Sequence, residues 1–143
     1  MHILYQEGSE MLKKKKAIAY LDQNGIKGQV TFQQKLQGVL VMAEMFGLPA
    51  QQEEWGIHGF HIHENCQGGH YNPNQAIHPY HAGDLPPLFS NEGYAYQTFI
   101  TNRFTLKEII GKTVVIHENP DDFKTQPSGS VGQKLVCGVI ESV

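Results

Sequence analysis

The sequence lacks the long hydrophobic runs that membrane-spanning helices require. Such a helix needs about 18 consecutive apolar residues, and the best candidate, residues 38–50, is interrupted by Glu44. A basic excess is lacking too, because the formal net charge is −3 and the only basic run is Lys13–Lys16. A run this short is typical of a solvated segment ahead of an apolar strand. We therefore expect no membrane span and no nucleic-acid partner.

The sequence also lacks a recognisable export signal and is poor in cysteine. Residues 1–16 place their charges after a short apolar piece, which is the reverse of a secretory signal. We therefore expect a cytoplasmic location for the chain as given, and a periplasmic or extracellular one if an export signal is missing from it. The two cysteines, Cys66 and Cys137, fit either separate core thiols or a disulfide, and a disulfide would suit an oxidising compartment.

Helical patterns are almost absent, whereas short strand patterns recur. The length of 143 residues suits one domain, residues 1–143, in which residues 1–13 are expected to form a poorly ordered extension. Strand-like segments cover residues 17–21, 28–34, 39–46, 55–64, 94–100, 113–117 and 134–143, with a helical turn at 105–110 and long loops at 65–93 and 118–132. Seven or eight short strands separated by turns predict an all-β, Greek-key sandwich or barrel of immunoglobulin-like type.

Histidine is concentrated in one stretch, since six of the eight histidines fall between His58 and Asp84. His61 and His63 stand two apart in a strand pattern, so both imidazoles project from one face while their apolar neighbours project from the other. His58 has the opposite parity and is expected to be a structural histidine that hydrogen-bonds the backbone. The loop that follows adds further metal-ligating side chains: His70, His78, His81 and Asp84.

A second strand pattern, residues 113–117, ends in His117. Alternation places Ile116 on one face of this strand and His117 on the other. If Ile116 packs against the apolar face of the first histidine strand, His117 emerges on the side of its imidazoles. Asp121 follows four residues later, where a carboxylate can orient ligand imidazoles, whereas its neighbour Asp122 is expected to be a solvated loop acid.

Counting donors predicts two metal sites that share one residue. Four imidazoles could hold one ion: His61, His63, His70 and His117. Three imidazoles and a carboxylate could hold another: His70, His78, His81 and Asp84. The first set suits Cu²⁺, which leads the affinity order for nitrogen ligands and changes oxidation state, and the second suits tetrahedral Zn²⁺. His70 could bridge the two ions, because two nearby cations stabilise an imidazolate.

These motifs resemble those of the copper/zinc superoxide dismutases. The matching segments are GIHGFHIHE (56–64), GGHYNP (68–73), HAGDLPPL (81–88), GKTVVIHENPDD (111–122) and KLVCGVIE (134–141). The resemblance implies a flattened, eight-stranded Greek-key barrel, with copper and zinc on the two donor sets just given. It further implies that Asp121 links the two sites, that His58 is structural, and that Cys66 and Cys137 form a disulfide.

Three departures from the family pattern concern the site. Lys134 stands where the family has an arginine that docks the superoxide anion, so we expect activity to be lowered and not abolished. The segment between His63 and His70 is short. The loop over residues 122–132 lacks the family's charged cluster, for which Lys124 partly substitutes.

The implied function is that of an oxidoreductase with an antioxidant role, which converts superoxide to dioxygen and hydrogen peroxide. Copper would cycle between two oxidation states, His70 would carry a proton, and Lys134 would attract the anionic substrate. Two alternatives stay open: a copper-buffering or metal-delivery protein with little turnover, and a structural or interaction module that binds zinc alone. The implied partner is superoxide, and a homodimer is neither required nor excluded.

Overall fold

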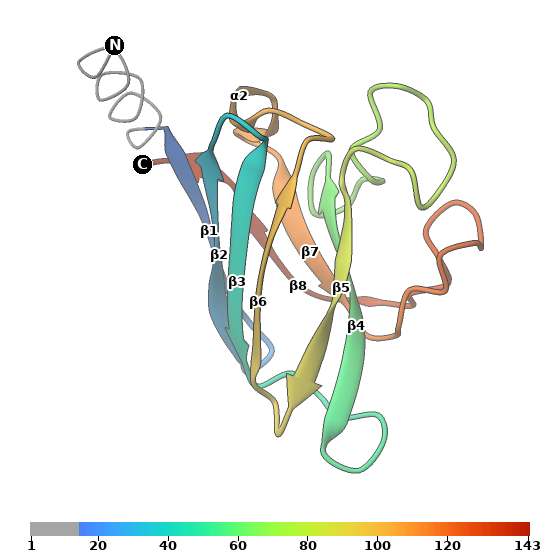
Figure 1. The fold of residues 1–143 in the computed structure, drawn as a ribbon. Coiled ribbons are helices and arrows are strands. Elements are labelled where there is room, and N and C mark those ends of the chain that lie inside the picture. Colours follow the sequence, from blue (N-terminus) through green and yellow to red (C-terminus); the bar gives the residue numbers. More distant parts are fainter. Residues whose placement is uncertain (1–14) are drawn as a thin grey trace.

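The computed structural model describes residues 15–143, in which strands dominate (Figure 1). In chain order the elements are β1 (Lys16–Gln23), β2 (Ile26–Gln34), β3 (Val39–Phe46), β4 (Trp55–His63), β5 (Asp84–Asn91), β6 (Ala95–Thr101), α2 (Leu106–Ile109), β7 (Thr113–His117), β8 (Lys134–Val139) and β9 (Glu141–Ser142). The poorly ordered extension expected for residues 1–13 lies outside the described residues. Within residues 15–143, no helix has the length and apolar character needed to cross a membrane.

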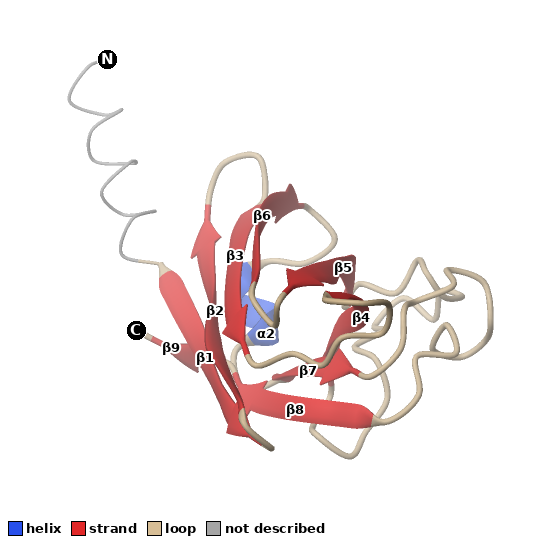
Figure 2. Cartoon of the chain, turned by 90° about the horizontal axis from the view of Figure 1, so that it is seen from below, coloured by secondary structure: helices blue, strands red, loops and turns tan. Residues whose placement is uncertain are grey.

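The strands form two antiparallel sheets that pack as a sandwich (Figure 2). One sheet has the order β6-β3-β2-β1-β9, and the other has the order β5-β4-β7-β8. β3 and β6 are neighbours although β4 and β5, which lie between them in the chain, belong to the other sheet. This is a Greek-key connection. The prediction of an all-β Greek-key sandwich is confirmed, and the two sheets do not join into one closed barrel.

The first hairpin follows the sequence pattern closely. β1 and β2 pair residue by residue from Lys16, opposite Gln33, down to the turn. The turn residues Asn24 and Gly25 both have positive φ, 58° and 77°. A two-residue turn of this kind matches the twist of the strands on either side. The predicted strand segments 17–21 and 28–34 therefore form a hairpin.

Strand β5 occupies residues for which the sequence predicts a loop that continues to Gly93. The sequence of β5, DLPPLFSN, contains Pro86 and Pro87, and proline cannot donate a hydrogen bond to a sheet. β5 is an edge strand with β4 on one side only, and an edge strand tolerates proline because one row of its amides needs no partner strand. The loop prediction is therefore wrong for residues 84–91.

The closing strand is also different from the expected single strand over residues 134–143. β8 pairs with β7 in the four-stranded sheet, whereas β9 pairs with β1 in the five-stranded sheet. Between them lies Ile140, whose side chain is fully buried in the core. The chain therefore crosses from one sheet to the other at Ile140 and contributes to both layers.

The short helix α2 confirms the predicted helical turn and reaches the loop that carries His70. The backbone amide of Thr105, which precedes the helix, donates to Oε1 of Glu108 at 2.6 Å, as in a capping box. The Glu108 carboxylate also accepts a hydrogen bond from the hydroxyl of Tyr71. α2 therefore braces the residue that directly follows His70.

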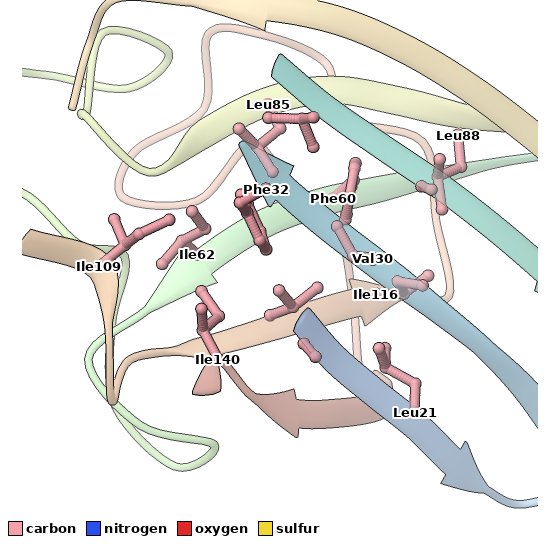
Figure 3. Packing of buried hydrophobic residues seen from close by; sticks show 14 of the residues in the cluster. Leu21, Val30, Phe32, Phe60, Ile62, Leu85, Leu88, Ile109, Ile116 and Ile140 are labelled. Carbon is pink, nitrogen blue, oxygen red and sulfur yellow. The ribbon is translucent and has the colours of Figure 1, made fainter. Parts of the chain in front are cut away.

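Apolar side chains that alternate along the strands fill the space between the sheets. Phe60 and Ile62 of β4 have no exposed surface, and Ile116 of β7 packs beside them (Figure 3). Phe60 and Ile116 are direct register partners. Because neighbouring residues of a strand project to opposite faces, His61, His63 and His117 emerge on the face away from this core. Both long loops lie on that side of the molecule (Figure 1).

Candidate metal centre

Three histidines on adjacent strands emerge on one face of the four-stranded sheet. His61 and His63 lie on β4, and His117 ends the neighbouring strand β7. The Nε2 atoms of His63 and His117 are 3.3 Å apart. His70, from the loop after β4, joins them, and its ring centroid is 4.0 Å from that of His61. One donor nitrogen from each of these four residues lies within 4.8 Å of the other three.

A second group of donors lies beside the first and shares His61 and His70 with it. Donor atoms of His61, His70, His78 and Asp84 lie within 4.8 Å of one another. His81 borders this group, with its Nδ1 3.0 Å from Nδ1 of His70 and 3.4 Å from Oδ2 of Asp84. Nδ1 of His70 is also 2.8 Å from Oδ1 of Asp84. All the side chains that the sequence offers as ligands therefore meet at one centre. His61 and His70 lie in both groups, and the second group contains His61 where the predicted zinc set has His81.

Backbone hydrogen bonds fold the loop that carries His70 back along β4. The amide of Tyr71 donates to the carbonyl of Ile62 at 2.8 Å, and the amide of Ile62 donates to the carbonyl of Gly83 at 2.8 Å. The amide of Gly83 in turn donates to the carbonyl of Tyr71 at 2.9 Å. His70 and Asp84 each adjoin one of these bonded residues, so the backbone fixes both beside β4.

A buried carboxylate joins the two groups. Oδ2 of Asp121 is 2.8 Å from Nε2 of His61, and Oδ1 of Asp121 is 2.7 Å from Nε2 of His78. Burial opposes ionisation of Asp121, but hydrogen bonds from the two histidines and from the amide of Phe123 outweigh it and hold the pKa of the carboxyl well below its ordinary value. An ionised carboxylate accepts a hydrogen bond from the protonated Nε2 of each ring, His61 and His78. This leaves Nδ1 of each ring free to bind a cation.

Several buried nitrogens of the centre have no hydrogen-bond partner within the described residues. They are Nδ1 of His61, Nδ1 of His78, Nδ1 of His117 and Nε2 of His70. An unpaired buried polar atom costs about 1–3 kcal/mol, and a bound cation would satisfy it. Burial lowers the pKa of His63 and of His117 to about 3, so both rings are neutral at pH 7, as metal ligands must be. A group of nitrogens next to a group that includes a carboxylate fits copper beside zinc.

Lys134 lies on β8 next to the four-histidine group and braces a neighbouring segment. Its Nζ donates to the carbonyl of Cys66 at 2.6 Å and to the carbonyl of Gly68 at 3.0 Å. The same Gly68 carbonyl lies 2.8 Å from Nδ1 of His63. Lys134 is half-buried, and this burial lowers its pKa. These carbonyl contacts, which the sequence does not indicate, use two of the three ammonium hydrogens and leave one for an anion.

A disulfide ties the same segment to β8. Cys66 and Cys137, 71 residues apart in the chain, are joined with a Cα–Cα distance of 6.0 Å. Of the two arrangements that the residues alone leave open, the structure therefore contains the disulfide that the family resemblance implies. The short stretch between His63 and His70 is held to β8 by this bond as well as by Lys134.

The remaining residues singled out in the sequence lie around the centre. His58 is buried, with Nδ1 2.9 Å from the carbonyl of His117 and Nε2 3.0 Å from the carbonyl of Pro49. It therefore connects the end of β7 to the segment before β4 and supplies no donor to either group. Asp122 and Lys124 are both exposed in the loop after β7.

Two residues that the sequence analysis does not single out contact the backbone around His78 and His81. Gln126 hydrogen-bonds His78, 48 residues away, and Arg103 hydrogen-bonds the carbonyls of Pro79 and His81, 24 and 22 residues away. No local pattern marks either residue, because each contact exists only after distant segments have come together.

Acidification should destabilise the metal-free protein. The pKa of His63 and of His117 is about 3 in the folded chain, whereas an unfolded histidine keeps a pKa near 6.5. Between these pH values the unfolded chain binds more protons than the folded chain. The contribution of the two neutral rings to the free energy of unfolding is therefore complete above about pH 6.5 and falls as the pH approaches 3. We expect the thermal unfolding midpoint of metal-free protein, followed by circular dichroism, to drop between about pH 7.5 and 4.5.

The control for this prediction is the double variant His63→Gln with His117→Gln. It lacks the two titrating rings and should give a flatter midpoint–pH profile than the wild type. A wild-type midpoint that stays constant over this pH range would contradict the prediction.

Known proteins resemble this chain over most of its length. Residues 26–140 match the family described as copper/zinc superoxide dismutase (SODC). A Cu-Zn superoxide dismutase of Deinococcus radiodurans is 33% identical, over 86% of this chain and 82% of that protein. One of Legionella pneumophila is 35% identical, over 80% of this chain and 77% of that protein. The extracellular Cu-Zn superoxide dismutase of Drosophila melanogaster is 36% identical, over 87% of this chain and 83% of that protein.

A solved structure supports the same relationship. The crystal structure of the clock protein EA4 superposes on this fold with a TM-score of 0.78 at 32% identity, and the match covers 90% of this chain and 94% of that one. The family pattern thus extends over both sheets and over the segments that carry the donor groups. On these grounds the chain belongs to the copper/zinc superoxide dismutase family.

Proposed function

We propose that this protein is a superoxide dismutase, an oxidoreductase that converts two superoxide ions to dioxygen and hydrogen peroxide. The observation that carries the proposal is the place of His70, which belongs to both donor groups, with its Nδ1 2.8 Å from Oδ1 of Asp84 and its Nε2 without a partner in the described residues. A redox-active ion and an inert ion could be held on opposite sides of one imidazole. Membership of the family supports the same activity.

The proposed ligand sets are those that the donors predict. Copper would be held by His61, His63, His70 and His117, and zinc by His70, His78, His81 and Asp84. Bound copper would supply one-electron chemistry, and bound zinc a fixed positive charge. The Asp84 carboxyl suits the zinc side. Burial opposes its ionisation, but the hydrogen bond with His70 and the electrostatic interactions with His70 and His78 outweigh burial and lower its pKa, so that it is ionised at pH 7.

The side chains of the centre have three further roles in this proposal. Asp121 orients His61 and His78 through their Nε2 atoms and so directs their Nδ1 atoms at the ions. Hydrogen peroxide requires two protons, and Nε2 of His70, which has no partner in the described residues, is an atom at which the chain can hold one of them. Lys134 attracts the anion through its remaining N–H.

The attraction of Lys134 for an anionic substrate acts only at short range. The chain carries a formal net charge of −3, which repels an anionic substrate at long range. Within a Debye length of about 8 Å at physiological salt, the Lys134 ammonium offers the opposite charge. A lysine has no planar pair of donors for a diatomic anion, so we propose that this protein is slower than it would be with arginine at this position.

We also propose a periplasmic or extracellular location and a homodimeric assembly. The Cys66–Cys137 disulfide is a kind of bond that persists in oxidising compartments, which supports a periplasmic or extracellular location over a cytoplasmic one. A homodimer is supported by exposed apolar side chains on edge strands, among them Phe89 of β5 and Tyr96 of β6, which are 61% and 58% exposed.

The decisive experiment measures metal content and dismutation on the same samples. We expect protein reconstituted with both metals to hold nearly equal amounts of copper and zinc, to give a copper spectrum with nitrogen ligands, and to accelerate superoxide decay. Protein loaded with zinc alone is the matched control and should not accelerate it. Both metals bound without acceleration would favour the copper-buffering alternative, and zinc binding alone would favour the structural module.

A further inference from the structure

The loop segment that carries His78 and His81 has no regular secondary structure, yet side chains from two distant parts of the chain hold its backbone. The first is Gln126, in the loop between β7 and β8. The amide of His78 donates to Oε1 of Gln126 at 2.9 Å, and Nε2 of Gln126 donates to the carbonyl of His78 at 2.8 Å. The side-chain amide thus pairs with His78 as a neighbouring strand would.

The second is Arg103, the only arginine in the chain, which lies between β6 and α2. Its Nη1 donates to the carbonyl of Pro79 at 2.7 Å and lies 3.3 Å from the carbonyl of His81. The guanidinium carbon is 5.8 Å from the ring centroid of Tyr80, so it also contacts the residue between the two carbonyls. Residues 78–81 are therefore held from two sides.

We propose that Gln126 and Arg103 are positioning residues that hold residues 78–81 in the conformation that binds zinc. This inference rests on the proposed zinc site, whose affinity for zinc would depend on these two residues. A loop that is already ordered does not lose conformational freedom when the ion arrives, so more of the binding free energy is retained. Groups that orient ligands in this way typically contribute 10- to 100-fold to metal affinity.

The charge of Arg103 separates positioning from a simple electrostatic effect. A guanidinium next to a cation site opposes binding of the cation, so removing it would tighten zinc binding if charge alone mattered. The variant Gln126→Glu adds a negative charge and would also tighten zinc binding on that basis. It is nearly isosteric, but it replaces the Nε2 donor with an oxygen that faces the carbonyl of His78. Positioning predicts weaker binding in both cases.

The experiment measures zinc affinity by competition with a chromophoric chelator in the wild type, Arg103→Ala and Gln126→Glu. Co²⁺ substituted at the zinc site reports ligand geometry through its visible absorption, and unfolding of the metal-free proteins reports overall stability. We expect zinc affinity to fall about 10- to 100-fold in each variant, with an altered Co²⁺ spectrum. Lys107→Ala removes one positive charge from an exposed position on α2 and should change neither.

Arg103→Lys is the second variant, in case Arg103→Ala does not fold. It keeps the charge and can reach one carbonyl, so its zinc affinity should lie between those of the wild type and Arg103→Ala. Zinc affinity that is unchanged or higher in Arg103→Lys and Gln126→Glu would overturn the inference. So would weaker binding that merely follows lower stability of the metal-free protein, with an unchanged Co²⁺ spectrum. A wild-type protein that binds no zinc would overturn the proposed function itself.

Discussion

Lys134→Glu is expected to slow superoxide dismutation by about 100-fold or more and to invert its dependence on salt. The substitution replaces the half-buried cation of β8 with an anion at the place where the substrate must approach. It also turns two attractive contacts, with the carbonyls of Cys66 and Gly68 at 2.6 and 3.0 Å, into repulsions beside His63. The substitution should therefore slow the encounter with superoxide and disturb the geometry around His63.

The measurement is the second-order rate constant from stopped-flow decay of superoxide at several ionic strengths, on protein with equal metal content. In the wild type, salt should slow the reaction because it screens attraction, and in the variant salt should speed it. Lys134→Arg should be faster than the wild type, because the planar guanidinium suits a diatomic anion. Lys124→Glu, at an exposed loop position, should have a smaller effect. An unchanged rate in Lys134→Glu would remove this residue from the mechanism.

Loss of the Cys66–Cys137 disulfide is expected to lower the free energy of unfolding by about 4 kcal/mol, from the loop entropy of a long closed segment. The bond spans 71 residues, and such a loss is a large fraction of the 5–15 kcal/mol that typical domains possess. The short segment after His63 would then lose its covalent link to β8 and keep the contacts of its Cys66 and Gly68 carbonyls with Lys134. We therefore also expect reduction to lower the affinity for copper more than the affinity for zinc.

Denaturant unfolding of the double variant Cys66→Ser with Cys137→Ser, compared with the oxidised wild type, measures this effect. The reduced wild type is the control, because it keeps both side chains and breaks only the bond. Equal unfolding midpoints in all three samples would contradict the entropic account.

The ligand-bearing strands could be predicted from the sequence because alternation is a local property. Phe60 and Ile62 identify the buried face of β4, and the histidines between and after them must project to the other face. In the same way, Ile116 identifies the buried face of β7, so His117 must project to the other face. These orientations could be predicted from the strands alone, given that apolar side chains meet in one core.

Other features escaped prediction because they depend on neighbours that the sequence does not reveal. Pro86 and Pro87 are compatible with a strand only because β5 lies at an edge, and edge position is a property of the assembled sheet. The break at Ile140 arises from crossing between sheets. Gln126 and Arg103 hydrogen-bond backbone groups, which every residue possesses. Their partners therefore cannot be predicted from a sequence motif.

The pairing of β9 with β1 brings the C-terminus beside the first described strand, with the amide of Val143 donating to the carbonyl of Lys16 at 3.0 Å. The loop that carries His70, His78 and His81 extends from the opposite side of the molecule (Figure 1). Attachment of the protein to an electrode or bead through residue 143 would therefore leave the histidine side facing solution. With residues 1–15 removed, a short linker from residue 143 to residue 16 would likewise permit circular permutation, with new ends opened in a distant turn such as that at Asn24 and Gly25.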